Sequence, residues 1–233
     1  MRANVSAILA ATALLCAGGA DAGLPLLTED GGVLGGLQCE AEAATFSTRV
    51  SAASGLERSL SLSCGVGYAS QLAVGISRAN QDGERANGLS FSGKTGLWAG
   101  QSGGSMAVAW GARWSRVTGG GWRDSGIVLN AVYSGPASVG LMLHGNLGHE
   151  RDPMERSVAT IWALALEHAA LALGGLQIAP MAEVFGDDHS APFWSAALRF
   201  TLLPDRFYLG LSYGRQINHA RARLATASIK FAF

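Results

Sequence analysis

Apolar side chains alternate with small or polar ones through most of this chain, and a period of two is the pattern of β-strands. In 59–68, serine or glycine takes every second position, and between them stand Leu60, Leu62, Cys64, Val66 and Tyr68. The same alternation recurs in 72–77, 106–114, 139–144 and 194–202. A soluble β-sandwich also alternates, but its two sheets bury apolar faces against each other. Small or polar residues on one face of nearly every strand instead predict lipid on one side and a wetter interior on the other.

The first 22 residues are organised like a secretory signal peptide, which predicts export. Arg2 supplies the positive start, Val5–Ala17 a short apolar run, and Ala20-Asp21-Ala22 a small-x-small cleavage site. The mature chain should therefore begin at Gly23. A lipoprotein attached through Cys16 is the alternative, which the large preceding leucine disfavours.

After this leader, the nearest approach to a membrane-spanning helix is Ile161–Pro180, which Glu167-His168 and Gly174-Gly175 interrupt. A helix there would place a carboxylate near mid-membrane, which is costly. A chain that enters the outer membrane without a helical span must do so as a closed barrel, because lipid offers the backbone no hydrogen-bond partners. We therefore expect an all-β fold, a closed antiparallel up-and-down barrel, located in the bacterial outer membrane.

The barrel should occupy 38–233 with about twelve strands; ten are possible, because the parity of two segments (126–134 and 175–185) is ambiguous. The expected strands are 38–48, 58–68, 71–79, 88–98, 105–116, 126–134, 137–148, 157–167, 175–185, 193–203, 207–216 and 223–233. An even number places both termini in the periplasm. Tight turns should lie on that side, at Ala69-Ser70, Gly135-Pro136 and Pro204-Asp205. Longer loops should lie outside, at 80–87, 117–125, 149–156 and 186–191. The glycine-rich lead-in 23–37 should sit in the barrel mouth or the periplasm.

Two cysteines remain after cleavage, Cys39 and Cys64, and an oxidising compartment permits a disulfide between them. Pairing them as neighbours in the first hairpin sets polar residues opposite polar ones and apolar residues opposite apolar ones, as in Ala41 with Leu62. Two free thiols that pack as small hydrophobic groups are the alternative.

The chain ends in a strand with an apolar residue at every second position and an aromatic residue at the terminus. This pattern resembles the last-strand signature that outer-membrane barrels present to their assembly machinery, and the candidate residues are Ile229, Phe231 and Phe233. An ordinary soluble edge strand is the alternative, although it has little reason to expose alternate aromatic residues.

Nine ionisable residues share the inward parity of their strands and are candidates for the wall of a lumen: Glu40, Glu42, Lys94, Arg113, His144, Glu167, Glu183, Arg199 and Lys230. In one interpretation they line an aqueous passage and select solutes. In the other, opposite charges pair and fill the interior. A barrel of about twelve strands is wide enough for a lumen unless a loop or the N-terminal segment plugs it.

Composition and motifs argue against other classes of function. The chain has 17 basic and 17 acidic residues and no polybasic block, so nucleic acid is not an expected partner. It has no HExxH, GxSxG or P-loop motif, and its five histidines are scattered. Asp187-Asp188-His189 reads as a solvated loop cluster rather than a metal site. We therefore expect no catalytic residues, no metal and no cofactor.

Three parts of the chain share short motifs with a known family: Leu24–Gly32 with Cys39–Glu42, then Ala179–Gly186, and the closing region with Leu198-Arg199, Pro204-Asp205 and Leu211–Gln216. These segments resemble a proteobacterial outer-membrane β-barrel family known by the description "MetA-pathway of phenol degradation" and counted among transporters. Glu29 stands where the family more often has aspartate. The resemblance implies an outer-membrane barrel of unproven substrate and supplies no catalytic residues.

The function expected from these features is a passive channel or uptake barrel for small solutes, including small organic compounds. Its other expected partners are outer-membrane lipid and the barrel-assembly machinery. A structural or interaction barrel with a filled interior is the second hypothesis, and an outer-membrane lipid-modifying enzyme is the third.

Overall fold

The computed structural model describes residues 25–51, 53–154, 156–217 and 222–233. The predicted signal peptide (1–22), its cleavage site and the first two residues of the lead-in lie outside the described residues. Among the described residues, no helix is long and apolar enough to cross a membrane.

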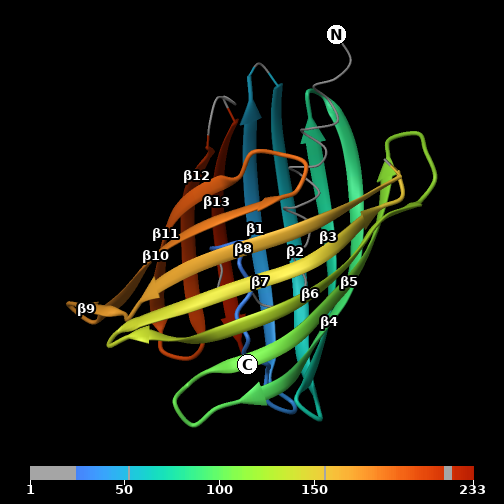
Figure 1. The fold of residues 1–233 in the computed structure, drawn as a ribbon. Coiled ribbons are helices and arrows are strands. Elements are labelled where there is room, and N and C mark those ends of the chain that lie inside the picture. Colours follow the sequence, from blue (N-terminus) through green and yellow to red (C-terminus); the bar gives the residue numbers. More distant parts are fainter. Residues whose placement is uncertain (1–24, 52, 155, 218–221) are drawn as a thin grey trace.

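Antiparallel strands close into a barrel in which each long strand pairs with its neighbours in the sequence, and the last strand pairs with the first (Figure 1). The strands are β1 (Cys39–Val50), β2 (Ala53–Gly67), β3 (Ser70–Gln81), β4 (Glu84–Ala99), β5 (Ser105–Val117), β6 (Arg123–Ser138), β7 (Leu141–Asp152), β8 (Ser157–His168), β9 (Leu171–Leu173), β10 (Leu176–Asp187), β11 (Phe193–Leu203), β12 (Phe207–Gln216) and β13 (Ala222–Ala232). The three-residue β9 pairs only with the start of β10 and projects beyond the wall. The other twelve form the barrel, which confirms the predicted fold and strand number.

The predicted turn at Gly135-Pro136 is wrong. β6 continues to Ser138, and the turn follows at Val139-Gly140. Pro136 lies opposite Met142, where the register shifts between Pro136 and Ser138. Proline has no N–H to donate to a neighbouring strand, and an irregularity near the strand end accommodates it.

The predicted contrast between short turns at one end and long loops at the other is also wrong. The segment 80–87, predicted as a loop, mostly belongs to β3 and β4, which a two-residue turn at Asp82-Gly83 connects. Asp-Gly is a favoured dipeptide for such hairpin turns because both of its residues take a positive φ, as they do here. Polar residues that looked like loop therefore extend the strands.

The two faces of the wall differ as predicted along most strands. Outward positions hold exposed apolar side chains such as Leu62, Val74 and Ile76, whereas inward positions hold small or polar residues such as Ser63 and Ala73. One inward cluster departs from this rule, because Phe46, Phe185 and Leu224 pack there with small alanines. Inside the barrel, an apolar zone therefore lies beside the polar wall.

Cys39 and Cys64 are direct partners in the β1–β2 register and form a disulfide, which confirms the prediction. Ala41 lies opposite Leu62, as the pairing of like residues requires. Cys39 also takes part in closing the barrel: its N–H donates to the carbonyl of Phe233 at 2.9 Å, and the N–H of Phe233 donates back at 2.9 Å. The disulfide and the seam between the first and last strands thus share one residue.

We expect C39S/C64S to fold into the same barrel and to lose about 2–4 kcal/mol of unfolding free energy, because the bond restricts mainly the unfolded chain. The measurement is urea unfolding in detergent micelles, followed by tryptophan fluorescence. Reductant should lower the urea midpoint of the wild type by the same amount as the double substitution does, and it should leave the midpoint of the variant unchanged. Equal midpoints for the oxidised wild type and the variant would show that the bond contributes nothing.

Candidate functional site

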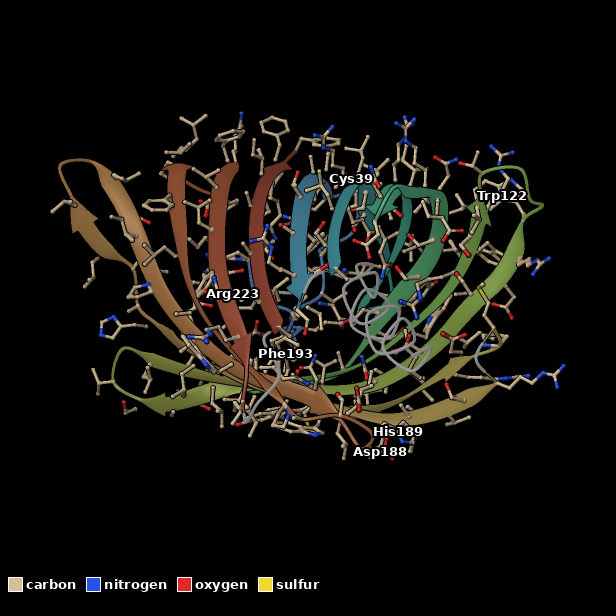
Figure 2. The ribbon with its side chains drawn as sticks, turned by 90° about the horizontal axis from the view of Figure 1, so that it is seen from above. Cys39, Trp122, Asp188, His189, Phe193 and Arg223 are labelled. Carbon is tan, nitrogen blue, oxygen red and sulfur yellow. A yellow bond between two sulfur atoms is a disulfide. The ribbon has the colours of Figure 1, made fainter. Side chains whose placement is uncertain are left out.

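The N-terminal segment Pro25–Leu37, called the lead-in segment below, crosses the interior of the barrel. Pro25, Leu26 and Thr28 are almost fully buried in it. Leu26 packs in one cluster with Met181 and with alanines of the wall. We expected this segment in the barrel mouth or the periplasm. The burial of residues 25–31 inside the barrel corrects that prediction for the first part of the segment, whereas residues 35–37 are exposed at the end of the barrel beside Gly65. Figure 2 looks down on the ring of strands that surrounds it.

Glu183 on β10 is the main anchor of the lead-in segment. The N–H groups of Leu27 and Thr28 donate to its Oε2 at 3.0 and 2.9 Å, and the Thr28 hydroxyl donates to the same oxygen at 2.8 Å. The hydroxyl of Ser195 on β11 donates to Oε1 at 2.8 Å. A buried carboxylate needs such donors, and charge-assisted hydrogen bonds are the stronger kind. The carboxylate therefore joins the segment to two neighbouring strands.

Three further strands hold the rest of the segment. The N–H of Gly31 donates to the Ser134 hydroxyl on β6 at 2.7 Å. Lys94 on β4, which is 1% exposed, donates to the carbonyl of Asp30 at 3.1 Å and lies 3.7 Å from its carboxylate. The N–H of Leu34 donates to the Gln71 side chain on β3 at 2.8 Å. All of these contacts are hydrogen bonds or ion pairs, and they involve five strands of the wall.

Arg113 on β5 pairs with Glu150 on β7 along the inner wall, over the intervening β6, and both side chains are almost fully buried. Gly126 gives the guanidinium room, since a Cβ there would lie 2.6 Å from Arg113 Nη2. Glu150 is absent from the predicted residues because the predicted strand ends at residue 148. Its parity, shared with His144, would have identified it as inward once the strand was extended.

A polar chain runs along the inner wall from β6 to β11. Ser134 Oγ lies 2.7 Å from His144 Nδ1, and His144 Nε2 lies 3.5 Å from Glu167 Oε2. Arg199 donates to the other oxygen of Glu167. Serine, histidine and glutamate are the residue types of a hydrolytic triad. Here the serine oxygen also accepts the Gly31 N–H, and Ser134 is 4% exposed. Ser134 is thus the member of this chain that contacts the lead-in segment.

The remaining candidates lie near the seam. Lys230 on β13 pairs with Glu40 on β1 at 3.2 Å, and its Nζ lies 5.9 Å from the ring centroid of Tyr208. Glu42 is the register partner of Lys230 and is partly buried. All nine predicted residues thus lie on the inner face of their strands, but they form several separate contacts rather than one ring. Their role in solute passage stays a prediction.

The apolar cluster is a second feature of the interior that was not predicted from the sequence. Phe46, Phe185 and Leu224 form its buried core, and Leu27 of the lead-in segment and Phe193 pack against it. The rings of Phe185 and Phe193 stack with centroids 5.6 Å apart. Phe46 shares the parity of Glu40 and Glu42, so strict counting along β1 would have placed it inside.

The loop between β10 and β11 carries the predicted solvated cluster, which Figure 2 labels at Asp188 and His189. The Thr160 N–H donates to Asp188 and lowers the pKa of that carboxyl. The Val158 carbonyl accepts from His189 Nε2 and, together with Asp188 at 3.5 Å, raises the pKa of that imidazole. These contacts fasten the loop to β8 at the rim.

The last strand exposes Ile229 and Phe231 on its outer face, and the terminal Phe233 stacks on Phe231 with ring centroids 5.8 Å apart. These side chains are available from outside the barrel. Recognition by the assembly machinery stays a prediction.

Comparison with known proteins supplies the fold and no closer relationship. No model of a protein family matches the chain, and no curated protein matches it. Among solved structures, the chain is similar to KdgM porin (TM-score 0.55, 7% identity, 82% of this chain and 99% of that one). It is also similar to NanC porin (TM-score 0.56, 10% identity, 82% and 98%). A third similar structure is the β domain of the Bordetella autotransporter BrkA (TM-score 0.58, 14% identity, 85% and 100%). The chain therefore has the barrel fold that porins and an autotransporter domain share.

Proposed function

We propose that this protein is an outer-membrane channel for small solutes and that the lead-in segment closes its pore. The observation that carries the proposal is the noncovalent attachment of this segment across the interior of a closed barrel, through Glu183, Ser134 and Lys94. A segment held in this way exchanges between bound and released states, and solutes pass in the released state.

Solutes with an apolar body and a polar or charged end suit this interior best. The cluster around Phe46 and Phe185 offers apolar contact, and Arg199, whose side chain is half-buried, offers charge. Small organic compounds belong to this class. The relationship to the "MetA-pathway of phenol degradation" family is part of this proposal, because the lead-in segment carries the opening motif of that resemblance.

The test is the conductance of the mature protein in planar bilayers. We expect brief stepwise openings from the intact chain and sustained conductance from a variant that lacks residues 25–36. A difference in gel mobility between unheated and boiled samples would show that both proteins are folded barrels. Folded protein that is silent in both forms would contradict the channel.

A structural barrel with a filled interior is the second candidate, and the buried pair of Arg113 with Glu150 favours it. Such a barrel would use the same contacts to stiffen the wall permanently. Removing the lead-in segment would then lower stability without opening a path for ions.

A further inference from the structure

Five arginines form a basic patch on the outer wall, toward the end of the barrel remote from Cys39 and Phe233. This arginine patch consists of Arg49, Arg58, Arg78, Arg215 and Arg223, which come from β1, β2, β3, β12 and β13. All five side chains are exposed. Each has the parity of the outward apolar residues of its strand, so the patch faces the surroundings of the barrel and not its interior.

The strand register brings these like charges side by side in two groups, one of three and one of two. Arg223 lies directly opposite Arg215 on one side and directly opposite Arg49 on the other. Arg58 lies directly opposite Arg78. Residues directly opposite across antiparallel strands have Cβ atoms about 4.5–5.5 Å apart, and like charges there destabilise the sheet. An anion bound between neighbouring guanidinium groups would therefore relieve their repulsion.

The protein itself does not supply that anion within the described residues. The ion pairs of the described lysines and arginines involve Lys94, Arg113, Arg199 and Lys230, all of them inside the barrel. The other register partners of the patch are uncharged: Trp194 lies opposite Arg215, and Ser54, Thr45 and Asn87 lie opposite Arg49, Arg58 and Arg78. Tyr213 and Leu60 adjoin the patch along their strands. Tryptophan and tyrosine favour the headgroup boundary of a membrane, which places the patch at headgroup level.

The choice of residue indicates the chemistry of the anion. Only two of the 17 basic residues in the chain are lysines, and both lie inside the barrel, so every cation of the patch is arginine. Arginine presents a planar fork of donors that matches phosphate, whereas lysine acts as a point charge. A phosphate monoester carries about −1.5 to −2 charges and three acceptor oxygens, enough to bridge two neighbouring guanidinium groups. A phosphodiester headgroup has a single negative charge to share.

We propose that the arginine patch binds the phosphomonoester groups of a lipid headgroup, such as the phosphorylated sugars of lipid A, in the leaflet around this end of the barrel. The proposal rests on the membrane location and not on conduction. It also assigns this end of the barrel to the leaflet that contains the phosphorylated glycolipid.

The test uses the mature protein in nonionic detergent micelles. Its thermal midpoint is measured by gel mobility during titration with diphosphorylated lipid A, with the same lipid lacking both phosphates, and with inorganic phosphate. We expect only the phosphorylated lipid to raise the midpoint. R49Q/R215Q/R223Q should need about tenfold more of it, since each lost arginine removes a charge-assisted contact. Without lipid, this variant should be at least as stable as the wild type, because the repulsion among the three guanidinium groups has been removed.

Two matched variants decide between a phosphate site and general attraction. R206Q, which removes one charge in the turn at the opposite end, should bind lipid A as the wild type does. R49K/R215K/R223K keeps the charge and loses the fork, and it should bind more weakly than the wild type. The proposal would be overturned if the lysine or the glutamine variant bound lipid A as tightly as the wild type does. It would also be overturned if inorganic phosphate raised the thermal midpoint as much as lipid A does, or if the glutamine variant were less stable than the wild type without lipid. A silent channel in bilayers would leave this outcome unaffected.

Discussion

E183A is expected to raise the open probability of the channel in planar bilayers by about a hundredfold. Glu183 accepts hydrogen bonds from Leu27, Thr28 and Ser195 in the buried interior. Hydrogen bonds to charged groups contribute roughly 1.5–3 kcal/mol each to stability. E183A removes the hydrogen bonds that Leu27 and Thr28 donate, and water replaces part of them. The equilibrium between the bound and released states of the lead-in segment should therefore shift toward release by about 3 kcal/mol, or two powers of ten.

The control for this prediction is E167Q. Glu167 is also inside the barrel, but its contacts are with His144 and Arg199 and not with the lead-in segment. This variant therefore removes a lumen charge and keeps the anchor, and we expect its open probability to stay near that of the wild type. E183Q keeps one acceptor oxygen of the two, and its open probability should lie between those of the wild type and E183A. Equal open probabilities for E183A and E167Q would show that Glu183 does not hold the segment.

R113M is expected to lower the unfolding free energy by about 3–5 kcal/mol, because it leaves Glu150 as a buried charge that has lost its principal partner. R113M/E150L removes both charges and should recover most of the loss. The measurement is urea unfolding in lipid vesicles, followed by the fluorescence of the tryptophans.

The size of this loss also tells how dry the interior is. In a water-filled lumen, Glu150 would be hydrated after the substitution, and the loss would resemble the value below about 1 kcal/mol that is typical of exposed pairs. A small loss in R113M, with no recovery in the double variant, would contradict a packed layer at this level. R116M on the same strand is the control, since Arg116 is exposed and contacts Trp122 at 5.3 Å.

Strand periodicity was enough to predict the closed barrel, because the alternation extends over most of the chain and lipid permits few other folds. It also predicted the inward parity of all nine ionisable residues. The register of the first hairpin followed from pairing Cys39 with Cys64 and matching Ala41 to Leu62. These features depend on which side of a strand a residue takes, and one-dimensional parity fixes that side.

Parity could not predict which inward residues meet. The contact between Lys94 and Asp30 joins a strand to a segment without periodicity, and the contact between Arg113 and Glu150 spans two strands with another between them. Such contacts depend on the tilt and stagger of the strands, which composition does not specify. The place of Pro25–Leu37 was likewise beyond the pattern, because its burial depends on acceptors such as Glu183 that are distant in sequence.

Cys39 stands where three strands converge: it is bonded to Cys64 on β2 and hydrogen-bonded to the last residue of the chain. The disulfide fixes the register of β1 against β2, and β1 is the strand on which β13 closes the barrel. A shift of β13 by one residue along that edge would turn its apolar face inward. One covalent bond near the beginning of the barrel thus holds in place the strand edge on which the whole wall closes.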